Sequence, residues 1–164
     1  MNVDFYETSG SKEPKTEIRR IDGESACAAA LLEQMCFSHP WSEKAILEEA
    51  QRGYFVAAYL DGAFAGYAGM TEVLDECGIC NVAVMPECRR HGIGEALVAD
   101  LIRRARETNA FVIMLEVRRS NAPAIKLYEK MGFELVGERK NFYDKPKEDA
   151  LLYNFYLHSN KTEL

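Results

Sequence analysis

One stretch of the chain restricts the fold more than any other, because it alternates strand-like and helix-like patterns. A β-rich segment over residues 78–85 ends at Pro86. A helical pattern with one apolar stripe follows over residues 94–108, and the nearly continuous apolar run 111–117 is typical of an interior strand. A strand, a helix and a second strand in this order form a crossover between parallel strands. The sequence therefore predicts parallel strands inside a sheet that helices cover.

The rest of the sequence predicts more elements of the same sheet. Asp61 and Gly62 form a strong two-residue hairpin turn between two β-rich segments. Together with the crossover, this turn indicates a mixed α/β (α+β) fold, a twisted sheet of about six to seven strands flanked by about four helices. The remaining expected strands are residues 17–22, 54–60, 63–73, 133–139 and 151–157, and the remaining expected helices are residues 25–36, 42–52 and 123–131.

The length and the charge of the chain limit its organisation and its partners. The 164 residues suit one hydrophobic core, so we expect a single domain over residues 17–158, between a leader over residues 1–16 and a short tail over residues 159–164. The net charge of -6 argues against a nucleic-acid partner, because phosphate binding needs an excess of Lys and Arg. No apolar stretch is long enough to cross a bilayer, and the start of the chain does not resemble a signal peptide. We therefore expect a cytoplasmic protein with no membrane partner.

The five cysteines suggest free thiols, because their number is odd. Cys77 and Cys80 have the spacing of a redox motif, but residues three apart on a strand face opposite ways. The three histidines are far apart in the sequence. We therefore expect neither a metal site nor a thioredoxin-like activity.

The turn between the strand that ends at Met85 and the next helix has the chemistry of a phosphate site. Gly92 and Gly94 leave backbone N–H groups free to point into a concavity at the positive end of the helix. Arg89 and Arg90 add two full positive charges. The residues after Gly94 fit neither a P-loop nor a dinucleotide-binding fingerprint. A diphosphate is the expected ligand, and the alternative is an ordinary turn with solvated arginines.

Two motifs resemble signatures of the GNAT acetyltransferases. The run Arg89-Arg90-His91-Gly92-Ile93-Gly94 resembles Arg/Gln-x-x-Gly-x-Gly/Ala, and residues 121–133 resemble Asn-x-x-Ala-x-x-Leu-Tyr-x-x-x-Gly-Phe at the family's spacing. Within that family, the closer resemblance is to the bacterial ribosomal-protein alanine N-acetyltransferases. It covers about residues 17–157 and rests on residues 40–43, 81–84, 115–118, 120–121 and 139–143.

The resemblance implies the GNAT fold, with acetyl-CoA as cosubstrate and no metal. In the family the pantetheine arm lies between two splayed parallel strands, which here would be residues 81–84 and 115–117. Backbone N–H groups of Val82 and Val84 would bind this arm and the thioester carbonyl, and Asn121 would contact the coenzyme through its side-chain amide. Glu95 would point outward, because a carboxylate directed at the phosphates would repel them. The implied coenzyme-binding residues are Val82, Ala83, Val84, Arg89, Arg90, His91, Gly92, Ile93, Gly94, Glu95 and Asn121.

Glu116 and Tyr128 are the expected catalytic residues. Glu116 ends an apolar strand, where an ionised carboxylate is costly unless it is solvated or paired, and Arg118 or Arg119 could pair with it. The resemblance implies instead that Glu116 is the general base, acting through water. Tyr128 has the helical spacing of a core residue, but the family places this hydroxyl beside the coenzyme sulfur as the general acid. An ordinary tyrosine pKa of about 10 keeps that proton in place at neutral pH.

The expected acceptor is the N-terminus of a protein. A single carboxylate suits an α-amino group, whose pKa of about 7.7–8.0 lies far below the roughly 10.4 of lysine. The closer resemblance implies the N-terminal alanine of a small-subunit ribosomal protein, a monomer or weak dimer, and Trp41, Arg139 and Tyr143 on the substrate side. For these three residues the alternatives are a helix staple onto Ile46 and loop surface. Two other functions remain open: acetylation of a small amine or a lysine, and non-catalytic acyl-CoA sensing.

Overall fold

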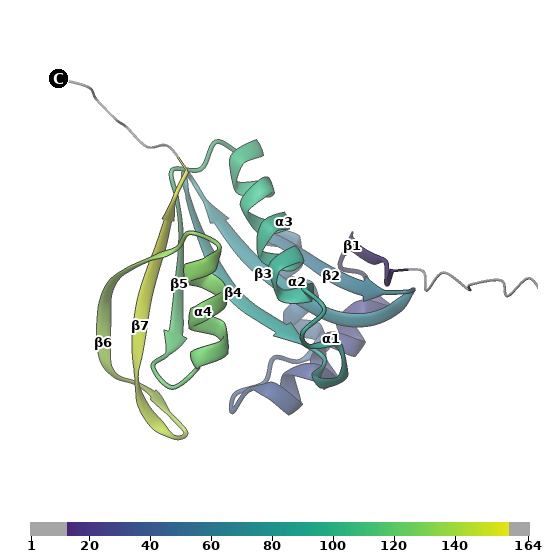
Figure 1. Cartoon of the computed structure of the whole chain (residues 1–164), viewed down its shortest axis with the longest axis horizontal. Helices are drawn as coiled ribbons and strands as arrows, with labels where there is room; N and C mark the ends of the chain where they lie inside the picture. The colour runs from purple at the N-terminus through teal and green to yellow at the C-terminus, as the bar shows by residue number, and fades with distance from the viewer. Residues whose placement is uncertain (1–12, 158–164) are drawn as a thin grey trace, which may run out of the picture.

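The computed structural model describes residues 13–157, and this part of the chain forms one seven-stranded sheet with four α-helices (Figure 1). The strand order is β1-β2-β3-β4-β5-β7-β6, and neighbours are antiparallel except for the parallel pair β4 and β5. The predicted mixed sheet with its crossover is confirmed. The terminal segments 1–12 and 158–164, which comprise most of the expected leader, the last residue of the expected domain and the expected tail, lie outside the described residues. The strands are β1 (Thr16–Arg20), β2 (Tyr54–Leu60), β3 (Ala63–Val73), β4 (Glu76–Val84), β5 (Val112–Arg118), β6 (Glu134–Asp144) and β7 (Lys147–Tyr156), and the helices are α1 (Gly23–Cys36), α2 (Glu43–Arg52), α3 (Ile93–Glu107) and α4 (Ala122–Lys130).

Local chemistry explains where several elements begin and end. Asp61 and Gly62 join β2 to β3 with φ angles of 49° and 85°, the left-handed conformation that this hairpin turn requires. Asp22 caps α1, because its side chain accepts a hydrogen bond from the Ser25 N–H at 2.9 Å. Since Asp22 serves this cap, β1 ends at Arg20 and not at residue 22 as the sequence predicted.

The last two strands are longer than the sequence predicted. β6 continues to Asp144 and β7 starts at Lys147, so the two strands form one long hairpin. Most side chains of β6 are exposed, and the segment therefore lacks the apolar alternation from which a strand is predicted. The pairing also shifts between Arg139 and Tyr143, where Asn141 has a positive φ of 53°. This hairpin carries two of the residues expected on the substrate side.

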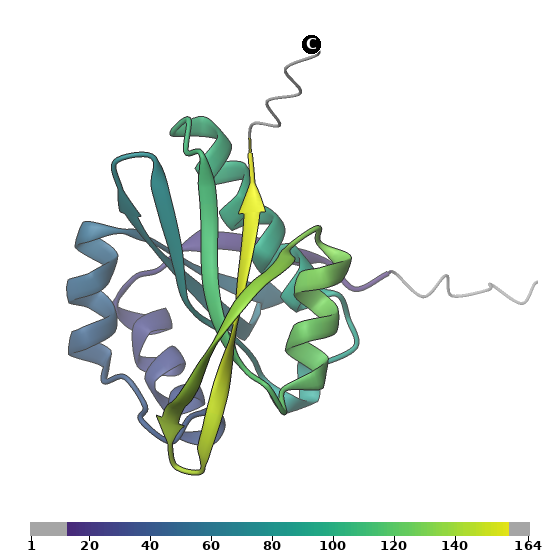
Figure 2. The same cartoon turned by 90° about the vertical axis from the view of Figure 1, so that its left-hand side faces the viewer.

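Two helices cover each face of the sheet (Figure 2). α3 and α4 pack on one face, where Leu97, Leu101 and Tyr128 belong to the larger core. α1 and α2 pack on the other face, where Leu32 and Ile46 belong to a core with residues of β2, β3 and β4. Within residues 13–157 no residue of β5, β6 or β7 joins this second core, so the face of β5 that looks away from α4 remains open. In the same part of the chain no helix has the length and apolar character of a membrane span.

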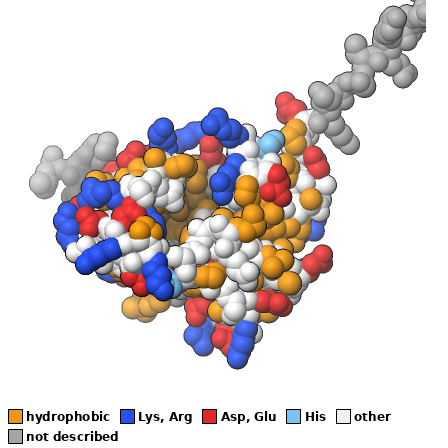
Figure 3. Space-filling model, turned by 90° about the horizontal axis from the view of Figure 1, so that it is seen from below, with side chains coloured by type: hydrophobic (Ala, Val, Ile, Leu, Met, Phe, Trp, Pro, Cys, Tyr) orange, Lys and Arg blue, Asp and Glu red, His pale blue; other side chains and the backbone are white. Residues whose placement is uncertain are grey.

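β4 and β5 separate after a short paired stretch. Their pairing covers only residues 76–78 and 112–114, although the strands continue to Val84 and Arg118. Figure 1 shows the two strands diverging toward their carboxyl ends, and Figure 3, seen from that side, shows a hollow with hydrophobic side chains inside it. We call this opening the central cleft. The splayed parallel strands implied by the family resemblance are therefore present.

The two cysteines with redox-motif spacing lie on opposite faces of β4, as predicted. Cys77 is buried in the core with α3, and Cys80 packs against the core with α1 and α2. Both thiols are free, and burial raises the pKa of each, to about 11 for Cys80. Neither thiol therefore has the character of a reactive thiolate.

Candidate active site

The turn from β4 into α3 lies beside the central cleft. A Cβ atom placed on Gly94 would lie 3.1 Å from Leu127 of α4 and 3.9 Å from Val84 of β4, so α3 begins between these two elements. A side chain at this position would push against α4. Gly94 thus serves close packing, in addition to the phosphate role that the sequence suggested.

Gly92 keeps the space in front of α3 open. Its φ is 73°, and a Cβ atom placed on it would meet no atom within 4 Å. Arg90 also has a positive φ, of 64°, so the backbone passes twice through the left-handed region. The first N–H groups of α3, those of residues 93–95, have no partner within the helix and carry its partial positive charge. This open, positive concavity suits a phosphate group.

The charged side chains of the turn have defined positions. Arg89 and Arg90 are exposed, and the Arg89 Nε lies 3.4 Å from a backbone carbonyl of β4. The ring of His91 folds back on the turn, with Nδ1 2.9 Å from the Arg89 carbonyl oxygen. Glu95 forms an ion pair with Lys130 of α4 at 2.5 Å. Its charge is therefore compensated by α4.

β4 directs unpaired backbone groups into the cleft. The Met85 N–H donates to the Ala65 carbonyl of β3 at 2.8 Å. Because N–H groups alternate in direction along a strand, those of Val84 and Val82 point the other way, toward β5. β5 has already separated from β4 there. The side chain of Ala83 is buried against α1 and α2, so this residue contributes only backbone to the cleft.

Asn121 begins α4 on the other side of the cleft. Its side-chain oxygen accepts a hydrogen bond from the Ala124 N–H at 3.3 Å and caps the helix. The amide nitrogen supplies two further donors, which the predicted coenzyme contact requires. Ile93, in contrast, is 1% exposed and packs in the core, so only its backbone N–H is available to a ligand.

Glu116 lies on the open face of β5. Its strand neighbours on either side are buried in the core with α3 and α4, so Glu116 points away from these helices. Its side chain is 33% exposed, and one carboxylate oxygen lies 2.8 Å from Nη1 of Arg139 on β6. The ion pair with Arg118 or Arg119 that the sequence left open is not formed, because both arginines pair with other carboxylates. Glu116 is thus paired and still accessible.

Tyr128 lies on the side of α4, in the core that Glu116 avoids. Its ring packs edge-on against Phe133, with 5.6 Å between the ring centres. Burial, helped by the nearby Tyr143, raises the pKa of Tyr128 above its ordinary value. Among residues 13–157, every fully buried side-chain oxygen has a hydrogen-bond partner. The Tyr128 hydroxyl has no hydrogen-bond partner in this part of the chain. Its oxygen is therefore accessible and not fully buried. This hydroxyl holds its proton at neutral pH.

Tyr143 of β6 lies near both of these groups. Burial and then the charge of Glu116 raise the pKa of Tyr143, which itself contributes to the raised pKa of Tyr128. Such coupling requires the three side chains to lie near one another. The guanidinium of Arg118 lies 4.2 Å from the centre of the Tyr143 ring. The structure therefore brings together residues that are distant in the sequence, from β5, α4 and β6.

Trp41 lies at the end of the loop between α1 and α2. Its ring stacks on Phe55 with 6.2 Å between ring centres, and it packs in the same core as Ile46, which agrees with the helix-staple interpretation. It also lines a pocket on the face of the sheet where Glu116 is exposed. Trp41 thus packs in the core and also lines this pocket. The other residues of this pocket are Ala45, Glu48, Glu49, Thr71 and Cys80.

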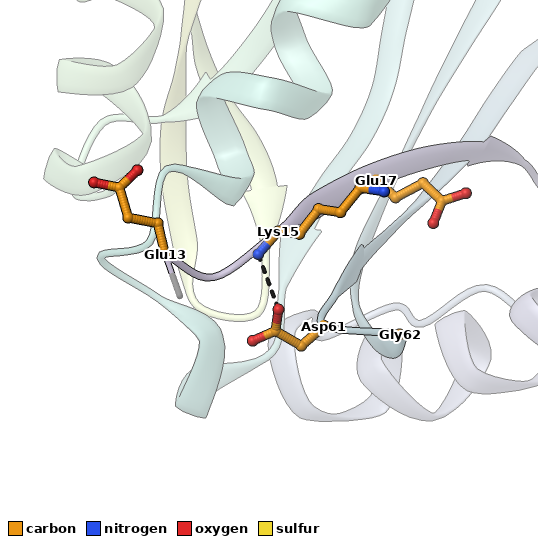
Figure 4. A pocket seen from close by; sticks show the side chains of 5 residues that line it. All are labelled: Glu13, Lys15, Glu17, Asp61 and Gly62. Carbon is orange, nitrogen blue, oxygen red and sulfur yellow. Dashed lines mark hydrogen bonds between the residues drawn. The ribbon is translucent and has the colours of Figure 1, made fainter. Parts of the chain in front are cut away.

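A second pocket, drawn in Figure 4, lies away from this chemistry. The backbone N–H of Lys15 donates to the Asp61 carboxylate at 2.9 Å there. These residues belong to the region of β1 and the β2–β3 turn, and β2 and β3 separate them from the central cleft. The pocket is lined by Glu13, Lys15, Glu17, Asp61 and Gly62.

Glu33 of α1 is a further buried polar residue that was not predicted from the sequence. This carboxylate is completely buried, and it accepts hydrogen bonds from the Tyr67 hydroxyl, from Asn81 and from the backbone N–H of Trp41. A signal was present, because Glu33 follows Ala26 and Ala29 at helical spacing, on the stripe that faces the sheet. A charged residue on such a stripe indicates a buried polar network.

Comparison with known proteins decides the family. Residues 27–133 match the Acetyltransferase (GNAT) family. The chain belongs to the GNAT acetyltransferases. The matched segment runs from α1 to the end of α4 and so contains the turn at Gly92, both strands of the cleft, Glu116 and Tyr128.

Relatives of this GNAT enzyme confirm the closer resemblance, to the ribosomal-protein alanine N-acetyltransferase known as RimI. The [ribosomal protein bS18]-alanine N-acetyltransferase of Escherichia coli is 38% identical over 128 residues, which are 76% of this chain and 86% of that protein. The crystal structure of the ribosomal-protein-S18-alanine N-acetyltransferase from Escherichia coli matches with a TM-score of 0.80 and 33% identity, over 92% of this chain and 99% of that chain. A structure of yncA from Salmonella typhimurium with its cofactor acetyl-CoA shares the fold, with a TM-score of 0.74 and 18% identity over 89% of this chain and 96% of that chain.

Proposed function

We propose that this enzyme transfers the acetyl group of acetyl-CoA to the N-terminal α-amino group of a protein, the N-terminal alanine of ribosomal protein bS18. The relatives that are 33% and 38% identical are named for this reaction. The observation that best supports the chemistry is the placement of Glu116 and Tyr128 on opposite sides of one cleft between splayed strands. A ribosomal acceptor also agrees with the cytoplasmic location expected from the sequence.

The coenzyme lies along β4 in this proposal. Its pyrophosphate occupies the concavity in front of Gly92, where the N–H groups of residues 93–95 and the charges of Arg89 and Arg90 neutralise it. Its pantetheine arm follows the free N–H groups of Val82 and Val84 into the cleft. The thioester then lies in the cleft, with Glu116 on one side and Tyr128 on the other.

The reaction is a direct attack of the amine on the thioester. A C–N bond forms as the C–S bond breaks, and the oxyanion that develops is stabilised by backbone N–H groups of β4. The proton of the amine passes through a water molecule to Glu116 on the open face. The departing thiolate takes the hydroxyl proton of Tyr128 on the other face, and solvent returns a proton to the phenolate. No covalent enzyme intermediate forms, so none of the five cysteines is required.

The acceptor approaches the open face, where two segments flank Glu116. One is the loop that ends at Trp41, and the other is the β6–β7 hairpin with Arg139 and Tyr143. His39 and Asp144 join these segments, with 2.7 Å between Nε2 and Oδ1. An extended peptide N-terminus fits between two such segments better than the side of a folded domain does.

Mass spectrometry of an acceptor peptide tests this function. A peptide that begins Ala-Arg and contains an internal lysine is expected to gain one acetyl group, on its N-terminal nitrogen, after incubation with enzyme and acetyl-CoA. The α-amine is preferred because it is much less basic than the lysine amine, by roughly 2.5 pKa units. The same peptide with a blocked N-terminus is the control. Acetylation of the blocked peptide, or of a polyamine in place of the free peptide, would contradict the proposed acceptor.

Replacing Gly92 by alanine is expected to weaken acetyl-CoA binding by about tenfold or more, an effect of roughly 1.4 kcal/mol. The new methyl group would occupy the open space that the pyrophosphate fills, because it meets no protein atom there. Gly62 is a matched control, since it has a φ of 85° and the same open surroundings, in a hairpin turn. Both substitutions cost about 1–2 kcal/mol of folding free energy. Calorimetric titration should show the loss of affinity in Gly92→Ala alone, and equal affinities would contradict the pyrophosphate site.

A further inference from the structure

Glu33 of α1 binds three donors from three different segments. It has no exposed surface. One carboxylate oxygen accepts from the Tyr67 hydroxyl of β3 and from the Asn81 amide of β4 at 2.9 Å. The other oxygen accepts from the backbone N–H of Trp41 at 2.9 Å. The Asn81 amide also donates to the Tyr67 oxygen at 3.2 Å, so the network is closed.

The donor from β4 comes from an irregular point of that strand. Asn81 is paired with Gly69 and Ile79 with Met70, so Cys80 is an extra residue, a β-bulge. Because of the bulge, the side chains of Cys80 and Asn81 both point toward α1. After Asn81 the side chains again alternate between the two faces of the sheet, and Val82 packs in the core under α3 and α4. The hydrogen bond to Glu33 therefore holds β4 at its bulge, one residue before the first N–H group that points into the cleft.

The donor from Trp41 comes from the acceptor side. Its backbone N–H is held by Glu33 and its ring rests on Phe55, so the end of the α1–α2 loop has two attachments. The carboxylate of Glu33 thus binds both β4, the strand along which the coenzyme is proposed to lie, and the α1–α2 loop on the proposed acceptor side.

The buried carboxylate of Glu33 carries a desolvation cost. Burial raises the pKa of Glu33 despite its three donors, which means that the ionised form is disfavoured by its surroundings. An apolar side chain at this position would leave the three buried donors without an acceptor, which costs stability for each donor. What the carboxylate adds is the fixed orientation of its three donors.

We propose that Glu33 is a positioning residue for acetyl transfer, which sets the distance between the acceptor loop at Trp41 and the coenzyme strand at the Cys80 bulge. The proposal rests on the proposed function, because it assigns these two segments to acceptor and coenzyme. Glu33 touches neither substrate and acts through Trp41 and Asn81. Its loss therefore affects the use of the acceptor, while the pyrophosphate site at Gly92 continues to hold the coenzyme.

Three substitutions test the proposal. Glu33→Leu removes both acceptor oxygens, and we expect kcat/KM for the acceptor peptide to fall by about tenfold or more, mainly through KM, because hydrogen bonds to a charged group are lost. The Kd of acetyl-CoA should change by less than about threefold, a loss of under roughly 0.7 kcal/mol. Glu33→Gln keeps the shape of the side chain and one acceptor oxygen. If the Asn81 amide rotates, the glutamine amide can form hydrogen bonds with Trp41, Tyr67 and Asn81. Activity should therefore return to within about threefold of the wild type.

The third substitution, Tyr67→Phe, has a matched control. Tyr54 is also a largely buried tyrosine whose hydroxyl donates to a carboxylate, that of Asp100, at 2.9 Å, but it lies at the far end of β2 under α3. Tyr67→Phe should raise the KM of the acceptor by about threefold, and Tyr54→Phe should leave it unchanged. This pair decides the question even if Glu33→Leu does not fold. Equal effects of the two tyrosine substitutions would show that only general stability is involved.

A second readout is independent of the acceptor. Trp41 is the single tryptophan of the chain, so intrinsic fluorescence reports on its loop alone. In Glu33→Leu and Tyr67→Phe the emission should shift to the red, with quenching by acrylamide about twofold stronger, because a released indole gains exposure to water. If the wild type acetylates no peptide, the proposed function fails and the fluorescence still tests Glu33. Unchanged quenching and unchanged acceptor KM in these variants would overturn the role of Glu33.

Discussion

Replacing Glu116 by glutamine is expected to lower kcat by about 10²- to 10⁴-fold, the range in which general bases contribute. Glutamine keeps the size of the side chain and can still accept from Arg139, but it cannot take a proton. The residual reaction then depends on amines that are already unprotonated. Its rate should rise by about tenfold per pH unit below the α-amino pKa of roughly 7.7–8.0 and level off above it. Steady-state kinetics over this pH range measure both effects.

Glu138→Gln is the control for this substitution. Glu138 is a surface carboxylate of β6 that pairs with Lys140 at 2.7 Å and with Arg119. A surface ion pair of this kind contributes about 0–1 kcal/mol, so kcat should remain at the wild-type value. If Glu116→Gln retained wild-type turnover, the base would have to be another group or bulk water, and the assignment of Glu116 would be wrong.

Replacing Tyr128 by phenylalanine is expected to lower kcat by about 10²-fold, the lower end of the range for general acids. Burial of the ring raises the pKa of Tyr128, so the hydroxyl keeps its proton at neutral pH until the thiolate departs. Acid catalysis matters less when the leaving group is more acidic. An aryl thioester in place of acetyl-CoA should therefore reduce the difference between wild type and variant, and a competition of the two thioesters measures this.

Tyr153→Phe is the control for effects of packing near α4. Tyr153 is 2% exposed, and its hydroxyl donates to Glu129 of α4 at 2.9 Å. This substitution should lower the thermal midpoint, because a hydrogen bond to a charged group contributes about 1.5–3 kcal/mol, and leave kcat unchanged. An equal fall in kcat in Tyr153→Phe, or an undiminished difference with the aryl thioester, would assign Tyr128 to the core rather than to the chemistry.

Features that depend on neighbours in the chain were predictable. The Asp61–Gly62 turn, the bounds of β2 and β3 and the helix that follows Gly92 agree with the structure, because periodicity and turn chemistry act over a few residues. The Gly92 turn was also recognisable as a candidate phosphate site, since glycine, arginine and a helix start coincide there. The long β6–β7 hairpin was not, because its exposed strands lack an apolar pattern.

The partners of the charged residues were settled only by the tertiary structure. Glu116 had two arginines close to it in the sequence and pairs with neither, because the strand directs them to different neighbours and brings Arg139 of β6 alongside. Glu33 collects donors that are 34 and 48 residues away, which no local pattern encodes. The sequence by itself thus determined most of the elements, the family motifs and the candidate groups. The packing of the sheet decided which groups meet, since strand pairing and bulges set side-chain direction over distances that sequence periodicity does not span.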